Sequence, residues 1–362
     1  MDTPTIIIDR SKLMNNIKKM ADVSNSNKVS LRPHIKTHKI PYIAKEQLNA
    51  GAVGITVAKV SEAEVMADYG INDIFIAYPL VTEKKIKKAI ELSKRIRLIV
   101  ATDCLQGATL LSKFASQSKI KLEVRLEVDT GLRRTGVLYN EALELAKKII
   151  VLPNLHLTGI YTFRGPVLNG KTTLQLKDAG IEEGKVMVTL AEQMNREGID
   201  IRDVSVGSTP TSEYAAEVAG VTEIRPGTYI FYDAMQEKYG SCAEEECAAT
   251  VHVTVVSRPS HDLAIIDGGS KTFATDVQPN QPPLLLKGFG KVVGHPNVTL
   301  ERVTEEHGML HIEGDSNLRV GDVLQIIPNH ICSTVNLHNE VSIIDQYGDC
   351  ERYAVLARGK LQ

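Results

Sequence analysis

The chain has 362 residues, and its 42 basic and 44 acidic residues give a formal net charge of −2. Because charges of both signs are interspersed, neither a nucleic acid nor a membrane surface is expected as the main partner. No apolar stretch approaches the length of a membrane span, and the N-terminus is acidic where a signal peptide would be basic. The five cysteines form no CxxC pair, which predicts free thiols and a reducing, cytoplasmic setting.

Short apolar runs alternate with helix-like stretches over the first part of the chain. The stretch 59–70 has apolar residues at helical spacing and ends in a glycine, and the stretch 82–95 opens with Thr82, a good N-cap residue. The apolar runs predict eight strands, at residues 28–37, 54–58, 73–78, 96–102, 122–128, 157–162, 203–209 and 223–230. Eight strands that alternate with helices predict an α/β fold, a (β/α)8 TIM barrel, although counting alone also allows an open sheet.

The pattern changes near residue 245, where helical periodicity fades. Short strand-like runs separated by turn residues follow, as in a β-sandwich or a small barrel. The N-terminal run TIIID, residues 5–9, precedes the first barrel strand and could join this second domain. The predicted division is therefore a barrel over residues 10–240 and a β domain of residues 1–9 and 241–362.

In such a barrel the chemistry lies at the carboxyl ends of the strands. Polar residues are frequent near these predicted strand ends: Lys36, Thr37, Lys59, Tyr78, Arg134, Tyr161, Arg164, Ser208, Thr209, Gly227 and Thr228. Residues with purely structural roles would not be expected to favour one end. From this set we take Lys36 and Tyr161 as the candidate catalytic residues.

The segment LRPHIKTHK, residues 31–39, is rich in basic groups. Read as a strand of period two, one face carries Arg32, His34, Lys36 and His38. A lysine in a barrel mouth beside other basic groups should have a lowered pKa, and a neutral amine can attack a carbonyl to form a Schiff base. An ion-paired lysine on a polar rim explains this segment equally well.

Two glycine-containing turns with hydroxyl residues end the last two predicted barrel strands, VGSTPT at 206–211 and RPGTY at 225–229. Barrels commonly bind phosphate at this place, through backbone N–H groups and hydroxyls. One such turn is weak evidence. Two of them, opposite a reactive lysine, indicate a phosphorylated aldehyde cofactor, namely pyridoxal 5'-phosphate.

The segment PNHIC, residues 328–332, offers a pair of metal ligands from the β domain. In a strand His330 and Cys332 would face the same way, and an imidazole with a thiolate suits zinc. Two ligands favour a catalytic ion with open positions over a closed structural site. Taken alone, however, the motif favours a buried cysteine beside a hydrogen-bonded histidine.

With these residues in view, the chain resembles the D-serine dehydratase and D-threonine aldolase family, which shares its fold with alanine racemase. The resemblance is carried, in order along nearly the whole chain, by RPHIKTHK, DTGLRRTGV, GSTPT, EIRPGTYIFYD and PNHICSTVNLH. It implies a fold type III pyridoxal-phosphate enzyme, with a (β/α)8 barrel followed by a β domain, and a homodimer.

The resemblance also implies roles for individual residues. Lys36 falls at the Schiff-base position, and Arg134 falls near the phenolic oxygen of the cofactor. Arg225 is a candidate to meet the pyridine nitrogen. The phosphate-binding residues would be Ser208, Thr209, Gly227 and Thr228.

Within the family, D-serine dehydratases carry His-x-Cys, whereas aldolase relatives are known with His-x-Asp and manganese-type ions. His330 and Cys332 therefore imply a zinc-dependent lyase that converts D-serine to pyruvate and ammonia. The alternatives are a D-threonine aldolase, then a 3-hydroxy-D-aspartate dehydratase or an amino-acid racemase, and outside enzymes a cofactor-carrying binding protein. Phe163 and Arg164 depart from the family pattern, and Arg164 could pair with a second substrate carboxylate.

Overall fold

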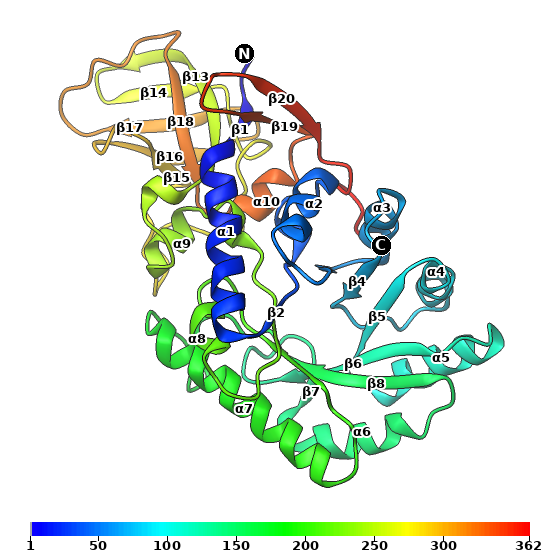
Figure 1. Cartoon of the computed structure of the whole chain (residues 1–362). Coiled ribbons are helices and arrows are strands. Elements are labelled where there is room, and N and C mark those ends of the chain that lie inside the picture. Colours follow the sequence, from blue (N-terminus) through cyan, green and yellow to red (C-terminus); the bar gives the residue numbers. More distant parts are fainter. Residues whose placement is uncertain (1) are drawn as a thin grey trace. The chain divides into compact units, whose positions relative to one another are not determined.

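The computed structural model describes residues 2–362, which divide into two compact units (Figure 1). The barrel unit consists of Lys19–Lys36, Pro41–Gly227 and Lys360–Gln362. The β unit consists of the residues up to Lys18, Thr37–Ile40 and Thr228–Gly359. Over residues 2–362, no helix combines the length and the apolar character needed to cross a membrane.

Parallel strands form the sheet of the barrel unit, in the order β2-β12-β11-β8-β6-β5-β4-β3. Their bounds are β2 (Ser30–Leu31), β3 (Ile55–Val57), β4 (Asp73–Ile76), β5 (Arg97–Thr102), β6 (Leu122–Asp129), β8 (Leu155–Tyr161), β11 (Asp203–Val206) and β12 (Glu223–Ile224). A parallel bridge between His34 and Thr56 joins the segment after β2 to β3. The sheet is therefore closed, and the predicted (β/α)8 barrel is confirmed.

Helices connect these strands, and Figure 1 shows α6 and α7 alongside β6 and β8. The helices and small elements of this part are α2 (Pro41–Asn49), α3 (Val60–Asp68), α4 (Glu83–Ser93), α5 (Leu105–Gln117), β7 (Val137–Leu138), η2 (Tyr139–Glu141), α6 (Ala142–Ile150), β9 (Val167–Leu168), β10 (Lys171–Thr172), α7 (Leu176–Arg196) and α8 (Ser212–Ala216), together with the part of α1 (Arg10–Asn27) that follows Lys18. Helix α4 shows the underlying pattern, because it buries Ile86, Ala89 and Ile90 on one face and leaves its lysines on the other.

The β unit has one large sheet, in the order β14-β17-β16-β15-β18-β13-β1-β19-β20. Its elements are β1 (Thr5–Asp9), η3 (Thr228–Ile230), α9 (Ala234–Tyr239), η4 (Glu244–Glu246), β13 (Ala249–Ser260), β14 (Leu263–Ile266), β15 (Gly290–Val292), β16 (Val298–Val303), β17 (Gly308–Ile312), β18 (Val323–Pro328), α10 (Ile331–Val335), β19 (Glu340–Ile344) and β20 (Cys350–Ala354). Strand β1 pairs with β13 and β19, so the N-terminal strand belongs to this sheet.

Two of the predicted barrel strands are much shorter than expected. The run 28–37 forms a strand only at β2, and Ile35–Thr37 is a 3-10 turn, η1. The run 223–230 likewise forms only β12 and then η3. Pro33 and Pro226 follow these strands and lack an N–H, so the regular ladder gives way to single hydrogen bonds, such as the one that the His34 N–H donates to the Pro226 carbonyl at 2.9 Å. The predicted period-two face of residues 32–38 is therefore wrong.

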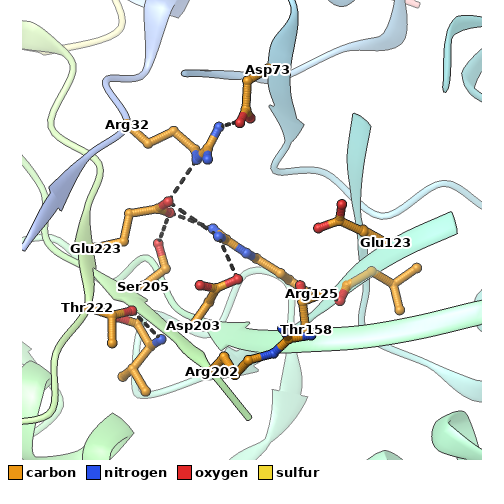
Figure 2. Close-up of polar contacts among 12 residues, drawn as sticks. Arg32, Asp73, Glu123, Arg125, Thr158, Arg202, Asp203, Ser205, Thr222 and Glu223 are labelled. Carbon is orange, nitrogen blue, oxygen red and sulfur yellow. Dashed lines mark hydrogen bonds and ion pairs between the residues drawn. The ribbon is translucent and has the colours of Figure 1, made fainter. Parts of the chain in front are cut away.

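A buried ionic network crosses the barrel on its amino-terminal side (Figure 2). Glu223, the first residue of β12, accepts hydrogen bonds from Arg32 Nε at 2.7 Å and Arg125 Nη1 at 2.5 Å. Ser205 Oγ donates to the same carboxylate at 2.6 Å. Both arginine side chains are at most 2 % exposed, so these charges depend on one another rather than on water.

Further carboxylates complete this network from the first residues of other strands. Asp73 of β4 pairs with Arg32, and Asp203 of β11 lies 3.0 Å from Arg125 Nη2. Gly54 is required here, because a Cβ at that position would collide with Arg32 and Asp73. The amino-terminal side thus stabilises the barrel, and the carboxyl ends of the strands are left for chemistry.

Candidate active site

Lys36 and Arg134 meet at one aromatic ring in the barrel unit. Lys36 lies in the turn η1, and its Nζ is 5.1 Å from the centre of the Phe163 ring. The guanidinium carbon of Arg134 is 4.9 Å from the same centre. Both are cation–π distances. Two of the residues predicted to contact a cofactor are therefore brought together by a residue that was not among the candidates.

Arg225 fixes the backbone that carries this ring. Its Nη2 donates to the carbonyl oxygen of Thr162 at 2.5 Å, and its Nη1 donates to Ser205 Oγ at 2.6 Å. The hydroxyl of Thr162 in turn donates to the carbonyl of Val128 at 2.8 Å. Arg225 is therefore held by the ends of two neighbouring strands and connects the candidate site to Glu223 through Ser205.

Tyr161 ends β8 and lies beneath this arginine. Its ring centre is 5.1 Å from the Arg225 guanidinium carbon, and Phe75 packs edge-on against it at 5.0 Å. The Tyr161 hydroxyl is buried and faces the Glu127 carboxylate, and beyond that carboxylate it has no hydrogen-bond partner within residues 2–362. Burial and the nearby Glu127 carboxylate raise the pKa of Tyr161 well above its ordinary value.

Glu127 is the second buried group in this region with an unsatisfied atom. Its Oε1 accepts a hydrogen bond from Thr135 at 2.8 Å, but its Oε2 has no partner among the described residues apart from the Tyr161 hydroxyl. Burial raises the pKa of this carboxyl. Tyr161 Oη and Glu127 Oε2 therefore face each other as a buried pair with no further partner among the described residues.

The first predicted phosphate turn is held together by its own hydroxyls. Thr211 Oγ1 lies 2.9 Å from Ser208 Oγ and accepts from the Ser208 N–H at 3.1 Å. Thr211 also donates to the buried carboxylate of Glu183 on α7 at 3.2 Å. Gly207 has φ +83° and could not carry a side chain, since a Cβ would lie 2.9 Å from the hydroxyl of Ser212. Thr209, between these residues, is half-buried.

The second predicted phosphate turn is divided between the two units. Gly227 is the last residue of its segment in the barrel unit, and Thr228 begins η3 in the β unit. The Thr228 hydroxyl lies 3.4 Å from Cys332 Sγ. Thr228 thus contacts a predicted metal ligand.

His330 and Cys332 do not lie in a strand, contrary to the sequence prediction. Strand β18 ends at Pro328, and His330 is the N-cap residue of the short helix α10. The two side chains nevertheless remain in contact. Asp233 is buried below them and accepts the Ile331 N–H at 3.0 Å, which holds the start of the helix in place.

A carboxylate orients the histidine of this pair. Asp276 Oδ2 lies 2.6 Å from His330 Nδ1 and accepts the Ser333 hydroxyl at 3.0 Å. Because Nδ1 is occupied, Nε2 is the nitrogen available to a metal. Burial would lower the pKa of His330, but Cys332 and Asp276 outweigh burial and raise it.

The Cys332 thiol is surrounded by hydroxyls. Thr37 Oγ1 lies 3.1 Å from the sulfur, in addition to Thr228. Burial would raise the pKa of this thiol, but His330 outweighs burial and lowers it. Within residues 2–362, no group of three or more His, Cys, Asp or Glu side chains is arranged to hold a metal ion. The donor set therefore offers an imidazole and a thiolate, with other positions left open.

Arg164 is occupied by contacts with its own unit. It is 2 % exposed, and its Nη1 lies 3.2 Å from Glu182 of α7 and donates to the carbonyl of Thr130. Its Nη2 donates to the carbonyl of Ala179 at 3.3 Å. The hypothesis that Arg164 pairs with a second substrate carboxylate finds no support in this geometry.

Four residues that contact the predicted site residues were not themselves predicted as part of the site: Phe163, Glu127, Glu183 and Asp276. Only Glu127 left a signal in the sequence. In LEVRLEVD, charged residues occupy every second position of a predicted barrel strand. These charged side chains therefore share one face of the strand, which must point either into the barrel or towards its helices.

The fold and the arrangement of these residues define the alanine racemase class. Residues 8–234 match the family described as alanine racemase, N-terminal domain, and residues 248–344 match the putative serine dehydratase domain. The chain belongs to the D-serine dehydratase and D-threonine aldolase family of alanine racemase-like, fold type III enzymes.

Relatives and solved structures match over nearly the whole chain. A D-threonine aldolase from Arthrobacter sp. is 29% identical over 99% of this chain and 93% of its own. A D-threo-3-hydroxyaspartate dehydratase from Delftia sp. is 32% identical over 92% of each chain, and a D-serine dehydratase from Dictyostelium discoideum is 28% identical over 95% and 94%. A cysteine-to-alanine variant of D-threo-3-hydroxyaspartate dehydratase, solved in its metal-free form, has a TM-score of 0.90 at 29% identity and covers 98% of this chain and 97% of its own.

Proposed function

We propose that this protein is a pyridoxal-phosphate- and metal-dependent lyase of β-hydroxy-D-amino acids, and that its principal reaction converts D-serine to pyruvate and ammonia. The observation that carries this proposal is the His330–Cys332 pair, with its thiol pKa lowered and its histidine oriented by Asp276. A racemase reaction would give no role to a metal ion held by this pair. The curated relatives that match over nearly the whole chain, which include an aldolase and dehydratases of hydroxy-amino acids, support the same class.

The residues of the barrel unit fit pyridoxal phosphate. Lys36, Arg134 and Arg225 supply cationic groups around the segment 161–163, and the buried Tyr161–Glu127 pair lies next to it. Lys36 would hold the cofactor covalently, Arg134 would face its phenolic oxygen, and Arg225 its pyridine nitrogen. The phosphate would bind at the two turns, through Ser208, Thr209, Gly227 and Thr228. The cofactor supplies an electron sink for carbanions at the α-carbon of an amino acid.

The residues of the β unit fit a divalent metal, and the thiolate favours zinc over manganese. His330 Nε2 and Cys332 Sγ would be the protein ligands, leaving positions for water and the β-hydroxyl of a substrate. Thr37, which follows Lys36 directly in the chain, supplies one of the hydroxyls on the sulfur. The metal supplies Lewis acidity for a hydroxide leaving group.

Three side chains near the cofactor position have separate roles: one accepts a proton, one excludes water and one donates a hydrogen bond. Lys36 Nζ would accept the proton from the α-carbon as a neutral amine. Phe163 packs beside Nζ and keeps bulk water from that side of the amine. Tyr161, whose pKa is raised, keeps its proton at neutral pH and can donate a hydrogen bond.

D-threonine aldolase is the alternative function, because the Arthrobacter relative matches over almost the whole chain. The same lysine and metal pair could serve carbon–carbon cleavage. The cysteine ligand favours the dehydratase, since the resemblance associates His-x-Cys with dehydratases. We also propose a homodimer, which the resemblance to racemase-like enzymes implies.

The direct test is an assay of the zinc- and cofactor-loaded protein with D-serine, D-threonine and D-threo-3-hydroxyaspartate, with L-serine as the stereochemical control. Keto acid, ammonia, glycine and aldehyde are measured separately. The proposal expects pyruvate and ammonia in equal amounts from D-serine and no reaction of L-serine. Glycine and acetaldehyde from D-threonine as the main products would establish the aldolase instead, and no product from any substrate would overturn the lyase assignment.

A further inference from the structure

Phe163 lies beside the nitrogen at which the substrate would react. Its ring centre is 5.1 Å from Lys36 Nζ, and the side chain is half-buried. The ring is held between two buried neighbours, Thr162 and Arg164, whose groups bond to Arg225, Thr130 and Ala179. The backbone that carries the ring is therefore held on both sides, and the ring presents an apolar surface next to Nζ.

An amino acid that replaces Lys36 on the cofactor brings its own nitrogen to the position of Nζ; this step depends on the proposed function. Its α-carbon then lies about 1.5 Å from that position. The β-carbon and its substituents extend further, to the distance at which carbon atoms touch a ring, about 3.5–4.0 Å from its atoms. Groups on the β-carbon are therefore within reach of Phe163.

The charges near this ring have other partners. Arg134 at this ring is assigned by the proposed function to the phenolic oxygen of the cofactor, and Lys36, which must act as a base once a substrate is bound, is then a neutral amine and not a cation. Arg164, the next residue in the chain, is neutralised by Glu182. A carboxylate on the β-carbon would lose water against an apolar ring without gaining a cation of its own, which is unfavourable.

We propose that Phe163 is a specificity-determining residue that selects β-hydroxy-D-amino acids whose β-carbon carries hydrogen or an alkyl group, and that it disfavours those with a second carboxylate. The substrate class is thus that of D-serine and D-threonine. Hydroxyaspartate-type substrates are disfavoured by this ring.

The test compares the wild type with Phe163→Gln, which keeps a similar length but is polar, and with Phe163→Leu, which keeps an apolar surface. The ratio of kcat/KM for D-serine to that for D-threo-3-hydroxyaspartate is measured for each. The inhibition constants of D-alanine and D-aspartate, which lack the β-hydroxyl, report binding separately from elimination. The visible spectrum of the bound cofactor verifies that each variant is folded and loaded.

The wild type should prefer D-serine, and Phe163→Gln should lower this ratio by about tenfold or more, the discrimination expected for a small change in an apolar pocket. Phe163→Leu should retain it. A wild type that prefers hydroxyaspartate, a Gln variant that keeps the ratio, or a Leu variant that loses it as fully as Gln would each overturn the inference. If the loaded protein cleaves none of the substrates, the proposed function itself fails, and the two failures are thereby distinguished.

Discussion

Replacing Glu223 by glutamine should destabilise the barrel more than any comparable surface change. The carboxylate is 3 % exposed and receives Arg32 Nε at 2.7 Å, Arg125 Nη1 at 2.5 Å and Ser205 Oγ at 2.6 Å (Figure 2). An amide has the same shape but no charge, and its NH₂ group would face a guanidinium. Two buried arginines would then lose a counter-charge.

The size of the loss in unfolding free energy depends on which carboxylates still pair with the two arginines in the variant. Removing one partner of a buried ion pair costs about 3–5 kcal/mol. Because Asp73 still pairs with Arg32, and Asp203 with Arg125, we expect a loss of about 3 kcal/mol, at the lower end of that range. Glu123→Gln is the matched control, since its pair with Arg97 at 2.8 Å is half-exposed and should contribute less than about 1 kcal/mol.

The loss of unfolding free energy caused by Glu223→Gln should depend on pH. Burial alone would raise the pKa of Glu223, but Arg125 and Arg32 outweigh burial and hold it below its ordinary value. A carboxyl with a lowered folded-state pKa contributes stability above its unfolded-state pKa of about 4.3, and loses it as the pH falls towards the folded-state pKa. The difference between wild type and Glu223→Gln should therefore be complete at neutral pH and shrink below about pH 4.

Urea unfolding, followed by circular dichroism at several pH values, measures this difference. With a slope of about 3 kcal/mol per molar urea, the midpoint at neutral pH should fall by about 1 M. A midpoint equal to that of the Glu123→Gln control would refute the reasoning. So would a difference that stays constant from neutral pH to pH 3.

Three further predictions concern the metal pair and the cofactor. Asp276→Asn should weaken zinc binding by about 10–100-fold, measured by chelator competition, whereas Ser333→Ala should change it less; equal effects would contradict an orienting role for the carboxylate. Chelation, or Cys332→Ala, should reduce activity on D-serine far more than on β-chloro-D-alanine, because chloride leaves without a Lewis acid; an equal loss on both would mean that the ion has another role. Arg225→Met should lower retention of the cofactor on dialysis and free the 161–163 backbone; unchanged retention would remove Arg225 from the cofactor site.

The barrel could be predicted because it follows local rules, and the same rules gave the strand ends at which we propose the chemistry. Alternating apolar runs specify strands and helices, and the carboxyl ends of parallel strands share one edge of the sheet. Lys36 was selected by these rules although its strand is only two residues long, whereas Arg225 was selected only through the family resemblance. The extent of these strands was overestimated, because hydrophobic alternation gave no weight to Pro33 and Pro226, each of which removes an N–H from the regular ladder.

The groups that support the site depend on contacts between distant residues. Asp276 meets His330 across 54 positions, and Glu223 meets Arg32 across 191. Periodicity carries no information about such pairs, because it reports which face of an element is apolar and not what that face meets. Phe163 is similar, since its position beside Lys36 results from the closure of the barrel.

The central claim, that Lys36 carries pyridoxal phosphate, is tested most directly by borohydride reduction of the cofactor-loaded protein, followed by proteolysis and mass spectrometry. The account predicts a pyridoxyl-phosphate mass on the peptide that contains residues 31–39, located at Lys36, and no such mass in Lys36→Ala. Modification of Lys59 or Lys271 instead, or no modification of a protein that still cleaves D-serine, would contradict it.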